Sequence, residues 1–173
     1  MKANELAQKT KVVVLDCDGV LTDGGLYYDH DGNVTKRFNV LDGLGIKAAQ
    51  GCGIIIAVIT GLDAKSVRSR INDLGIVDYY PGHLKKTACI EEIKAKYNLD
   101  WTEIAYIGDD WIDLPPMRLV GLPIAVANAM PEVKELALLE TEKNGGQGAV
   151  REALNYILQA QGKLEETVQK IGG

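Results

Sequence analysis

The sequence predicts an α/β fold with a Rossmann-like, doubly wound and mostly parallel sheet. Short apolar runs alternate with stretches of helical periodicity along the 173 residues. This order favours parallel strands that helices cover on both faces. Hydrophobic residues make up 46% and charged residues 25% of the chain, the composition of a globular protein with a buried core. We therefore expect a single domain over residues 1–173.

Runs rich in Val and Ile mark the strands, because β-branched side chains favour extended backbone. The predicted strands are residues 12–17, 54–59, 76–80, 104–107 and 123–126. Between them, apolar residues recur at helical spacing, and Gly75 and Gly121 stand where a glycine commonly ends a helix. The predicted helices are residues 43–52, 63–74, 86–97, 111–120, 131–137 and 148–161.

A β-hairpin is predicted over about residues 24–38. Two β-prone stretches, 26–28 and 34–38, flank the turn-forming sequence Asp-His-Asp-Gly-Asn. After residue 161 the apolar density falls, so residues 162–173 are expected to extend the last helix or to form a mobile tail.

Charge and composition exclude several classes of protein. The net charge is −5 and no block of Lys and Arg occurs, which argues against binding nucleic acid through phosphate contacts. A few cations in one place would still suffice for a small anion. The chain has no apolar run long enough for a bilayer and no signal-peptide pattern, and its three cysteines lack metal or redox spacing. We expect a cytoplasmic protein without a membrane partner.

Two carboxylates end the first apolar strand. On extended backbone Asp16 and Asp18 would point to the same face and repel each other. A divalent cation is the simplest way to relieve that repulsion, and the ends of such strands are where these sheets place ligands.

Four features combine into one reaction if the strand ends lie side by side. They are Asp16-x-Asp18-Gly, Thr60-Gly61, a lysine at position 85 or 86, and Gly-Asp109-Asp-x-x-Asp. Phosphoryl transfer needs such groups: a nucleophilic carboxylate, a second carboxyl group as acid and base, a hard cation and donors for the phosphate oxygens. Asp16 would attack phosphorus and Asp18 would serve the leaving group and then water. Thr60 and Lys86 would hold the phosphoryl group, and Mg²⁺ would bind Asp16, the Asp18 carbonyl and Asp109.

This order of motifs resembles the haloacid dehalogenase superfamily. A closer similarity, over about residues 10–161, is to its small capless branch of phosphatases that act on phosphorylated eight- and nine-carbon sugar acids. The resemblance implies Mg²⁺-dependent hydrolysis through an aspartyl phosphate. The implied substrate is 3-deoxy-D-manno-octulosonate (KDO) 8-phosphate, in lipopolysaccharide precursor synthesis. A nonulosonate 9-phosphate, a phosphopeptide and a non-catalytic oligomerisation module are the alternatives.

The resemblance also implies residues that contact the substrate. They are Asn39, Asp42, Gly43, Lys47, Gly61, Arg70 and Lys86. The Gly-Gly-x-Gly sequence at 145–148 would help to close the site. Leu41 and Leu62 stand where many relatives carry arginine, which leaves the exact sugar acid open because guanidinium groups are bidentate partners of carboxylates and phosphates.

Several of these residues have a second interpretation. Asp110 is equally suited to capping a helix, and Asp113 to orienting Lys86 or a metal-bound water. The spacing after Gly82 in the resembling family selects Lys86 over Lys85. Arg70 would otherwise pair with a nearby aspartate on the helix surface.

No segment is long enough for a lid domain. A hairpin and one helix fill the interval between Asp18 and Thr60, and one helix and one strand fill that between Thr60 and Lys86. An exposed hairpin rich in apolar residues is typical of an interaction site. We therefore expect a homotetramer, as the resemblance implies, in which a neighbouring subunit completes the active site.

Overall fold

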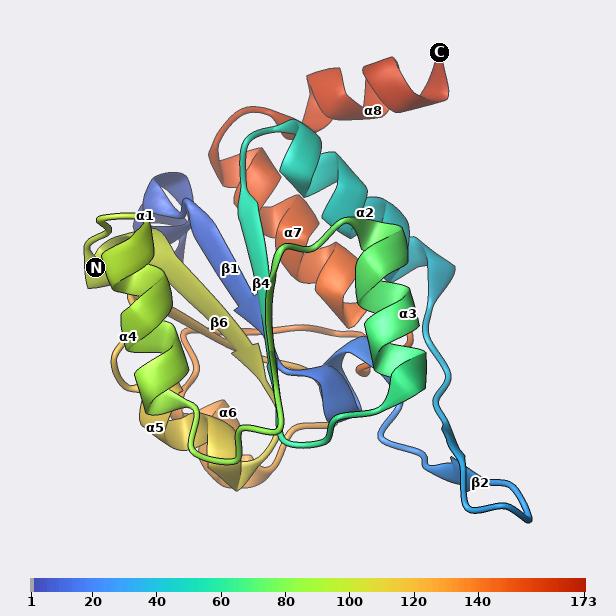
Figure 1. Ribbon diagram of the computed structural model, residues 1–173. Coiled ribbons are helices and arrows are strands. Elements are labelled where there is room, and N and C mark those ends of the chain that lie inside the picture. Colours follow the sequence, from blue (N-terminus) through green and yellow to red (C-terminus); the bar gives the residue numbers. More distant parts are fainter. Residues whose placement is uncertain (1) are drawn as a thin grey trace.

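The computed structural model describes residues 2–173 and shows one six-stranded sheet between two layers of helices (Figure 1). The strands lie in the order β5, β4, β1, β6, β7, β8, and every neighbouring pair is parallel. This is the predicted Rossmann-like α/β fold. The strands are Val12–Leu15 (β1), Ile55–Thr60 (β4), Asp78–Pro81 (β5), Ile104–Gly108 (β6), Leu122–Ala125 (β7) and Leu139–Glu140 (β8).

Helices α2, α3 and α7 cover one face of the sheet, and α4, α5 and α6 cover the other (Figure 1). They span Val40–Gly51 (α2), Lys65–Leu74 (α3), Thr87–Lys96 (α4), Leu114–Met117 (α5), Pro131–Leu136 (α6) and Ala149–Ala160 (α7). Gly75 ends α3 in the left-handed conformation, at φ 65°. The helix predicted over 111–120 is shorter: a 3₁₀ turn, Trp111–Asp113, precedes the single turn of α5. Pro115 and Pro116 fit only a first helical turn, because proline has no backbone N–H.

Three short elements differ from the sequence-based expectation. Helix α1 (Ala3–Lys9) buries Leu6 and packs against α7, and the two-residue strand β8 extends the sheet. The C-terminal tail forms a separate helix, α8 (Leu164–Gly172). Gly162, at φ 68°, lies between α7 and α8, and the chain changes direction there (Figure 1). No helix within residues 2–173 combines the length and the apolar character needed to cross a membrane.

The central strand β1 fixes the frame of the site. All four of its residues are buried, and Val14 pairs with Ala57 of β4 on one side and with Tyr106 of β6 on the other. Burying one such apolar side chain contributes about 1.5–3 kcal/mol. The first charged residue after this apolar strand is Asp16, so the packing of the core places a carboxylate at the C-terminal end of the central strand.

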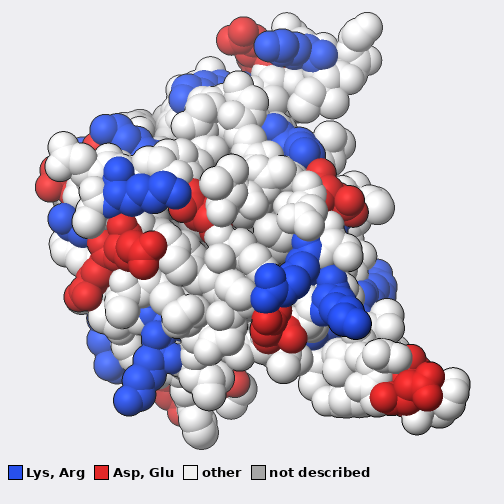
Figure 2. Space-filling view, in the orientation of Figure 1, with Lys and Arg blue, Asp and Glu red and all other residues white. Residues whose placement is uncertain are grey.

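The predicted hairpin is present and projects from the body of the molecule (Figure 1). Strands β2 (Tyr27–Tyr28) and β3 (Val34–Thr35) are antiparallel, and a bridge between Thr22 and Phe38 closes the base. Tyr27 and Tyr28 are 55% and 66% exposed. Figure 2 shows basic and acidic side chains interspersed over the visible face, with acidic groups at the end of the hairpin.

Candidate active site

The chain turns sharply where β1 ends. Strand β1 stops at Leu15 rather than at residue 17, and an irregular π-type turn, η1 (Cys17–Leu21), follows. Gly19 in this turn has φ 88°, and a Cβ added to it would lie 2.0 Å from Asp109 Oδ2. The expected side-by-side geometry of Asp16 and Asp18 on one extended strand is therefore wrong in detail, although both line the same cleft.

Lys86 lies between two carboxylates. Its fully buried Nζ donates to Asp16 Oδ1 at 2.5 Å and to Asp113 Oδ1 at 2.7 Å. Burial by itself lowers the pKa of this ammonium, but Asp16 and Asp113 together raise it further than burial lowers it. Lys85 is exposed. The structure thus brings Lys86, and not Lys85, to the end of β1.

Asp113 connects Lys86 with β6 and with the backbone that follows β6. Its Oδ1 also accepts a hydrogen bond from the Tyr106 hydroxyl at 2.7 Å, and its Oδ2 accepts from the backbone N–H groups of Asp109 and Asp110. The Asp113 carboxylate is fully buried, and each of its oxygens accepts two donors. Asp110 Oδ1 accepts a hydrogen bond from the N–H of Trp111 and so caps the following turn, which is one of the two roles predicted for Asp110.

Tyr106 was not among the predicted site residues, because it lies inside the apolar run of β6. It is completely buried, and burial followed by the charge of Asp113 raises the pKa of its phenol. The available signal was one hydroxyl in an otherwise apolar strand that precedes an acidic motif. A buried hydroxyl needs a partner, and here the partner is Asp113.

The carboxylates at this edge fit a divalent cation. Asp16, Asp109 and Asp113 each offer an oxygen, and these three atoms lie within 4.8 Å of one another. Asp109 Oδ1 is buried and accepts no hydrogen bond from residues 2–173. Burial raises the pKa of Asp16 and of Asp109, and neighbouring carboxylates raise both further. The unpartnered oxygen of Asp109 and the crowding of these carboxylates suit a hard cation such as Mg²⁺.

The charges of the site lead to the same conclusion. Carboxylates outnumber the two lysine ammonium groups here, so a cation would offset the excess of negative charge. The carboxylates are those of Asp16, Asp18, Asp109, Asp110 and Asp113, and the lysines are Lys36 and Lys86.

Asp18 has a partner that the sequence analysis did not single out. Lys36, which follows β3, donates from Nζ to Asp18 Oδ1 at 2.6 Å. The Lys36 side chain is fully buried, whereas that of Asp18 is 33% exposed. Lysine on a short hairpin is usually solvated, so nothing in the local sequence indicates this contact.

At the end of β4, Gly61 lines the cleft, whereas Thr60 is fully buried and is not among the residues that line it. Thr60 is buried at the end of β4, and its carbonyl accepts from the N–H of His83. Gly61 packs against Leu84, since a Cβ added to Gly61 would lie 2.7 Å from Leu84 Cδ2. The cleft has a volume of about 380 Å³. It is lined by Asp16, Asp18, Gly24, Leu26, Gly61, Leu62, Leu84, Asp110 and Ile112.

Most of the expected substrate loop is occupied by contacts within the chain. Asp42 is buried and its Oδ1 accepts from the N–H of Arg151, in the first turn of α7. Asn39 accepts from the N–H of Leu41 at the start of α2, and its own carbonyl accepts from Arg70. Asp42 Oδ1 therefore caps α7, whereas its buried Oδ2 accepts no hydrogen bond from residues 2–173, and contact of Asp42 with substrate stays a prediction.

Gly43 and Arg70 belong to the same set of contacts. A Cβ added to Gly43 would lie 2.2 Å from Arg70 Nη2, so the guanidinium approaches α2 closely at Gly43. Asp63 is instead paired with Arg68, and Arg70 makes the contact to Asn39. Arg70 thus braces the start of α2.

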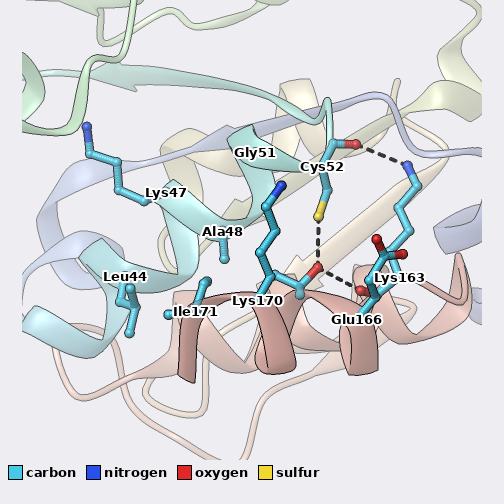
Figure 3. A pocket seen from close by; sticks show the side chains of 10 residues that line it. Leu44, Lys47, Ala48, Gly51, Cys52, Lys163, Glu166, Lys170 and Ile171 are labelled. Atoms are coloured by element: carbon cyan, nitrogen blue, oxygen red, sulfur yellow. Dashed lines mark hydrogen bonds between the residues drawn. The ribbon is translucent and has the colours of Figure 1, made fainter. Parts of the chain in front are cut away.

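Lys47 lies away from the cleft. It is on α2, beside a hollow of about 570 Å³ between α2 and α8, and Figure 3 shows its side chain directed away from α8. A Cβ added to Gly75, at the end of α3, would lie 3.6 Å from Lys47 Nζ. Within one chain the predicted contact of Lys47 with substrate is not supported.

The glycine-rich loop packs behind Gly19. The N–H of Gly145 donates to Asn128 Oδ1, and Asn128 Nδ2 donates to the carbonyl of Gly19. A Cβ added to Gly145 would lie 1.7 Å from that carbonyl oxygen, so only glycine allows this approach. The Gly146 carbonyl accepts from Arg37 and Asn39. The loop therefore supports the Asp18–Gly19 turn in the same chain.

Comparison with known families fits this geometry. The family model of the haloacid dehalogenase-like hydrolases matches residues 29–154, well over half of the chain. The chain belongs to the haloacid dehalogenase-like hydrolases. Within this family, a Salmonella typhi protein named 3-deoxy-D-manno-octulosonate 8-phosphate phosphatase KdsC is 44% identical over 160 residues, which cover 92% of this chain and 85% of that protein.

Two further haloacid dehalogenase-like hydrolases show the same similarity. A Haemophilus influenzae protein of the same name is 45% identical over 157 residues, 90% of this chain and 87% of its own. A solved structure of the Moraxella catarrhalis KDO 8-phosphate phosphatase, in complex with magnesium ion, phosphate ion and KDO, superposes with a TM-score of 0.95 at 36% identity. That match covers 98% of this chain and 97% of the other.

Proposed function

We propose that this chain is a Mg²⁺-dependent phosphatase that hydrolyses KDO 8-phosphate through an aspartyl-phosphate intermediate, in lipopolysaccharide precursor synthesis. The observation that carries the proposal is the cluster formed by Asp16 and Asp109, at the ends of adjoining strands, with Lys86 from the start of α4. The substrate is inferred from relatives of 43–45% identity that bear that name. The relative solved with magnesium, phosphate and KDO supports both the metal and the substrate.

Asp16 is the proposed nucleophile. Its contact with the buried ammonium of Lys86 favours the ionised carboxylate, which burial alone would disfavour. One carboxylate oxygen of Asp16 would bond to phosphorus as the bond from phosphorus to the sugar oxygen breaks. Asp18, in its protonated form, would give its proton to that leaving oxygen and become a carboxylate. Asp18 would then take a proton from the water that attacks phosphorus and releases Asp16 and inorganic phosphate.

Mg²⁺ would be held by Asp16, Asp109 and the backbone carbonyl of Asp18. The buried, unpartnered Oδ1 of Asp109 is the strongest indication for such an ion. When bound, the cation offsets the negative charge that carboxylates and phosphate bring together. Thr60, at the end of β4, and Lys86, at the start of α4, would hold the transferring group, and the hydrogen bond from Lys86 to Asp113 supports the position of Lys86.

The proposed assembly is a homotetramer in which a neighbouring subunit covers the cleft. The cleft has no lid within residues 2–173, and its walls carry the exposed side chains of Leu26, Leu62 and Leu84. Tyr27 and Tyr28 on the hairpin add exposed apolar surface beside it. Light scattering tests the assembly: a fully active monomer would contradict it.

A panel of phosphate monoesters tests the reaction. Released phosphate is measured for KDO 8-phosphate, for nonulosonate 9-phosphates and for a phosphopeptide, with Mg²⁺ and with a chelator. We expect KDO 8-phosphate to be hydrolysed best, and the activity to disappear with the chelator and in Asp16→Asn. If a nonulosonate 9-phosphate is hydrolysed faster than KDO 8-phosphate, the proposed substrate is wrong and the proposed reaction stands. A stable tetramer that hydrolyses none of them would indicate an oligomerisation module.

A further inference from the structure

Lys36 is a buried cation at the foot of an exposed hairpin. Its side chain has no exposed surface, whereas the neighbouring Thr35 and Arg37 are exposed. Taking an ammonium group out of water is costly unless an anion pairs with it. Asp18, 2.6 Å from Lys36 Nζ, supplies that anion. The hairpin therefore delivers one positive charge to the carboxylate proposed as acid and base.

We propose that Lys36 is a positioning residue that acts through Asp18, an inference that rests on the phosphatase function proposed above. Within residues 2–173, Lys36 is the only hydrogen-bond donor to the Asp18 side chain, and that side chain is partly exposed. Without this contact the carboxylate would rotate between solvent and cleft. Lys36 donates to Oδ1, so that Oδ2 of protonated Asp18 carries the proton that goes to the leaving oxygen, and Oδ2 of the resulting carboxylate then takes a proton from the attacking water.

The backbone around Lys36 is fixed by contacts on both sides. Ser66 Oγ of α3 donates to the carbonyl of Val34 at 3.4 Å, and the bridge between Thr22 and Phe38 anchors the following residues to the turn after β1. Lys36 is thus held between two anchored segments. A residue that orients another side chain needs such a fixed backbone. The position of Asp18 is set by the hairpin base as well as by the sheet.

The role of Lys36 has a chemical signature. Asp18 is needed as an acid when the leaving group is an alkoxide, but much less when it is 4-nitrophenolate, which is a stable anion. A residue that only orients Asp18 should therefore matter for an alkyl phosphate and matter little for an aryl phosphate. A residue that only supports the fold would affect both substrates equally.

The experiment compares Lys36→Met with the wild-type enzyme on KDO 8-phosphate, or on whichever sugar phosphate the wild type hydrolyses fastest, and on 4-nitrophenyl phosphate. The measured quantity is kcat/KM, which reports the steps up to formation of the phosphoenzyme and does not depend on its later hydrolysis. We expect a loss of about tenfold or more on the sugar phosphate and of less than about threefold on the aryl phosphate. Asp18→Asn should show the same contrast, and adding Lys36→Met to it should cause no further loss.

Lys85→Met is the matched control, because it removes an exposed lysine near the same edge of the sheet. Its kcat/KM should stay at the wild-type value for both substrates. Thermal unfolding of each variant is recorded, and Lys36→Gln replaces Lys36→Met if the latter is unfolded. Equal losses on both substrates, or no loss on the sugar phosphate, would overturn the role of Lys36 while leaving the phosphatase function intact. A wild-type enzyme that hydrolyses neither substrate would overturn both proposals.

Discussion

Tyr106 and Lys86 donate to the same oxygen of Asp113, each at 2.7 Å. The two donors come from the middle of β6 and from the start of α4, so a single carboxylate connects the core of the sheet with the lysine beside the proposed nucleophile. Asp113 acts in this way because it is fully buried and all of its acceptor positions are directed at protein groups.

Replacing Tyr106 with Phe should weaken the site without unfolding the protein. The substitution keeps the ring in the core and removes one hydrogen bond, while Asp113 Oδ1 still accepts from Lys86. We expect the free energy of unfolding to fall by about 1 kcal/mol. Because Lys86 would be held less firmly, kcat should fall several-fold with KM nearly unchanged. Denaturant titration and steady-state kinetics measure the two effects, and an unchanged kcat would contradict the link.

Adding one methyl group at Gly19 should abolish Mg²⁺ binding. In Gly19→Ala the new Cβ would lie 2.0 Å from Asp109 Oδ2 and would push that carboxylate away. Gly32→Ala is the matched control, since Gly32 also has a positive φ, 78°, but a Cβ there meets no atom within 4 Å. Calorimetric Mg²⁺ titration should show no binding to Gly19→Ala and normal binding to Gly32→Ala. Equal binding by both variants would show that Asp109 is not a ligand.

Asp42→Ala should reduce stability more than catalysis. Its carboxylate caps α7 from a position 109 residues earlier in the chain, and loss of such a cap costs about 1 kcal/mol or more. We expect a lower midpoint of thermal unfolding and a KM for KDO 8-phosphate within about twofold of the wild type. Asp73→Ala, at an exposed position of α3, serves as the control. A large increase in KM for Asp42→Ala would support contact of Asp42 with substrate.

Mg²⁺ binding should release protons near neutral pH. The pKa values of Asp16 and Asp109 are raised in the folded, metal-free protein, first by burial and then by neighbouring carboxylates. Their contribution to the stability of the metal-free fold is therefore greatest below the unfolded-state pKa and is lost as pH rises through the raised values. Mg²⁺ binds the ionised carboxylates, so its affinity should increase over the same pH range.

Calorimetry in two buffers with different ionisation enthalpies measures this proton release. Asp109→Asn provides the control, because it removes one of the two titrating groups and should bind Mg²⁺ weakly. Binding without proton release near neutral pH would show that both carboxyls are already ionised in the metal-free protein.

The sequence predicts the parts of this structure that depend on local pattern. Apolar runs locate β1, β4 and β6, and the polar residues that follow them, Asp16, Thr60 and Asp109, lie at one edge because parallel strands end together. Boundaries shift where a turn replaces extended backbone, as at Asp16, or where adjacent prolines shorten a helix, as in α5.

Contacts between distant segments were beyond prediction from one sequence. Lys36 and Tyr106 join the site only because folding places them against Asp18 and Asp113, and their own neighbours in sequence give no sign of it. Asp42 is the reverse case: its residue type suits a ligand-binding loop, and tertiary packing gives its Oδ1 a capping role at α7. Which of the two roles a polar residue has depends on the groups that tertiary packing brings to it.

The close approach of Gly145 to Gly19 has a consequence for biosynthesis. The turn after β1 leaves the ribosome early, but its supporting loop lies more than a hundred residues later, and the contact of Asn128 with both glycines forms only when that loop has emerged. Contacts of such large sequence separation form late and slowly. A nascent chain that stops before the loop should therefore be unable to capture the metal, which couples completion of translation to the onset of activity.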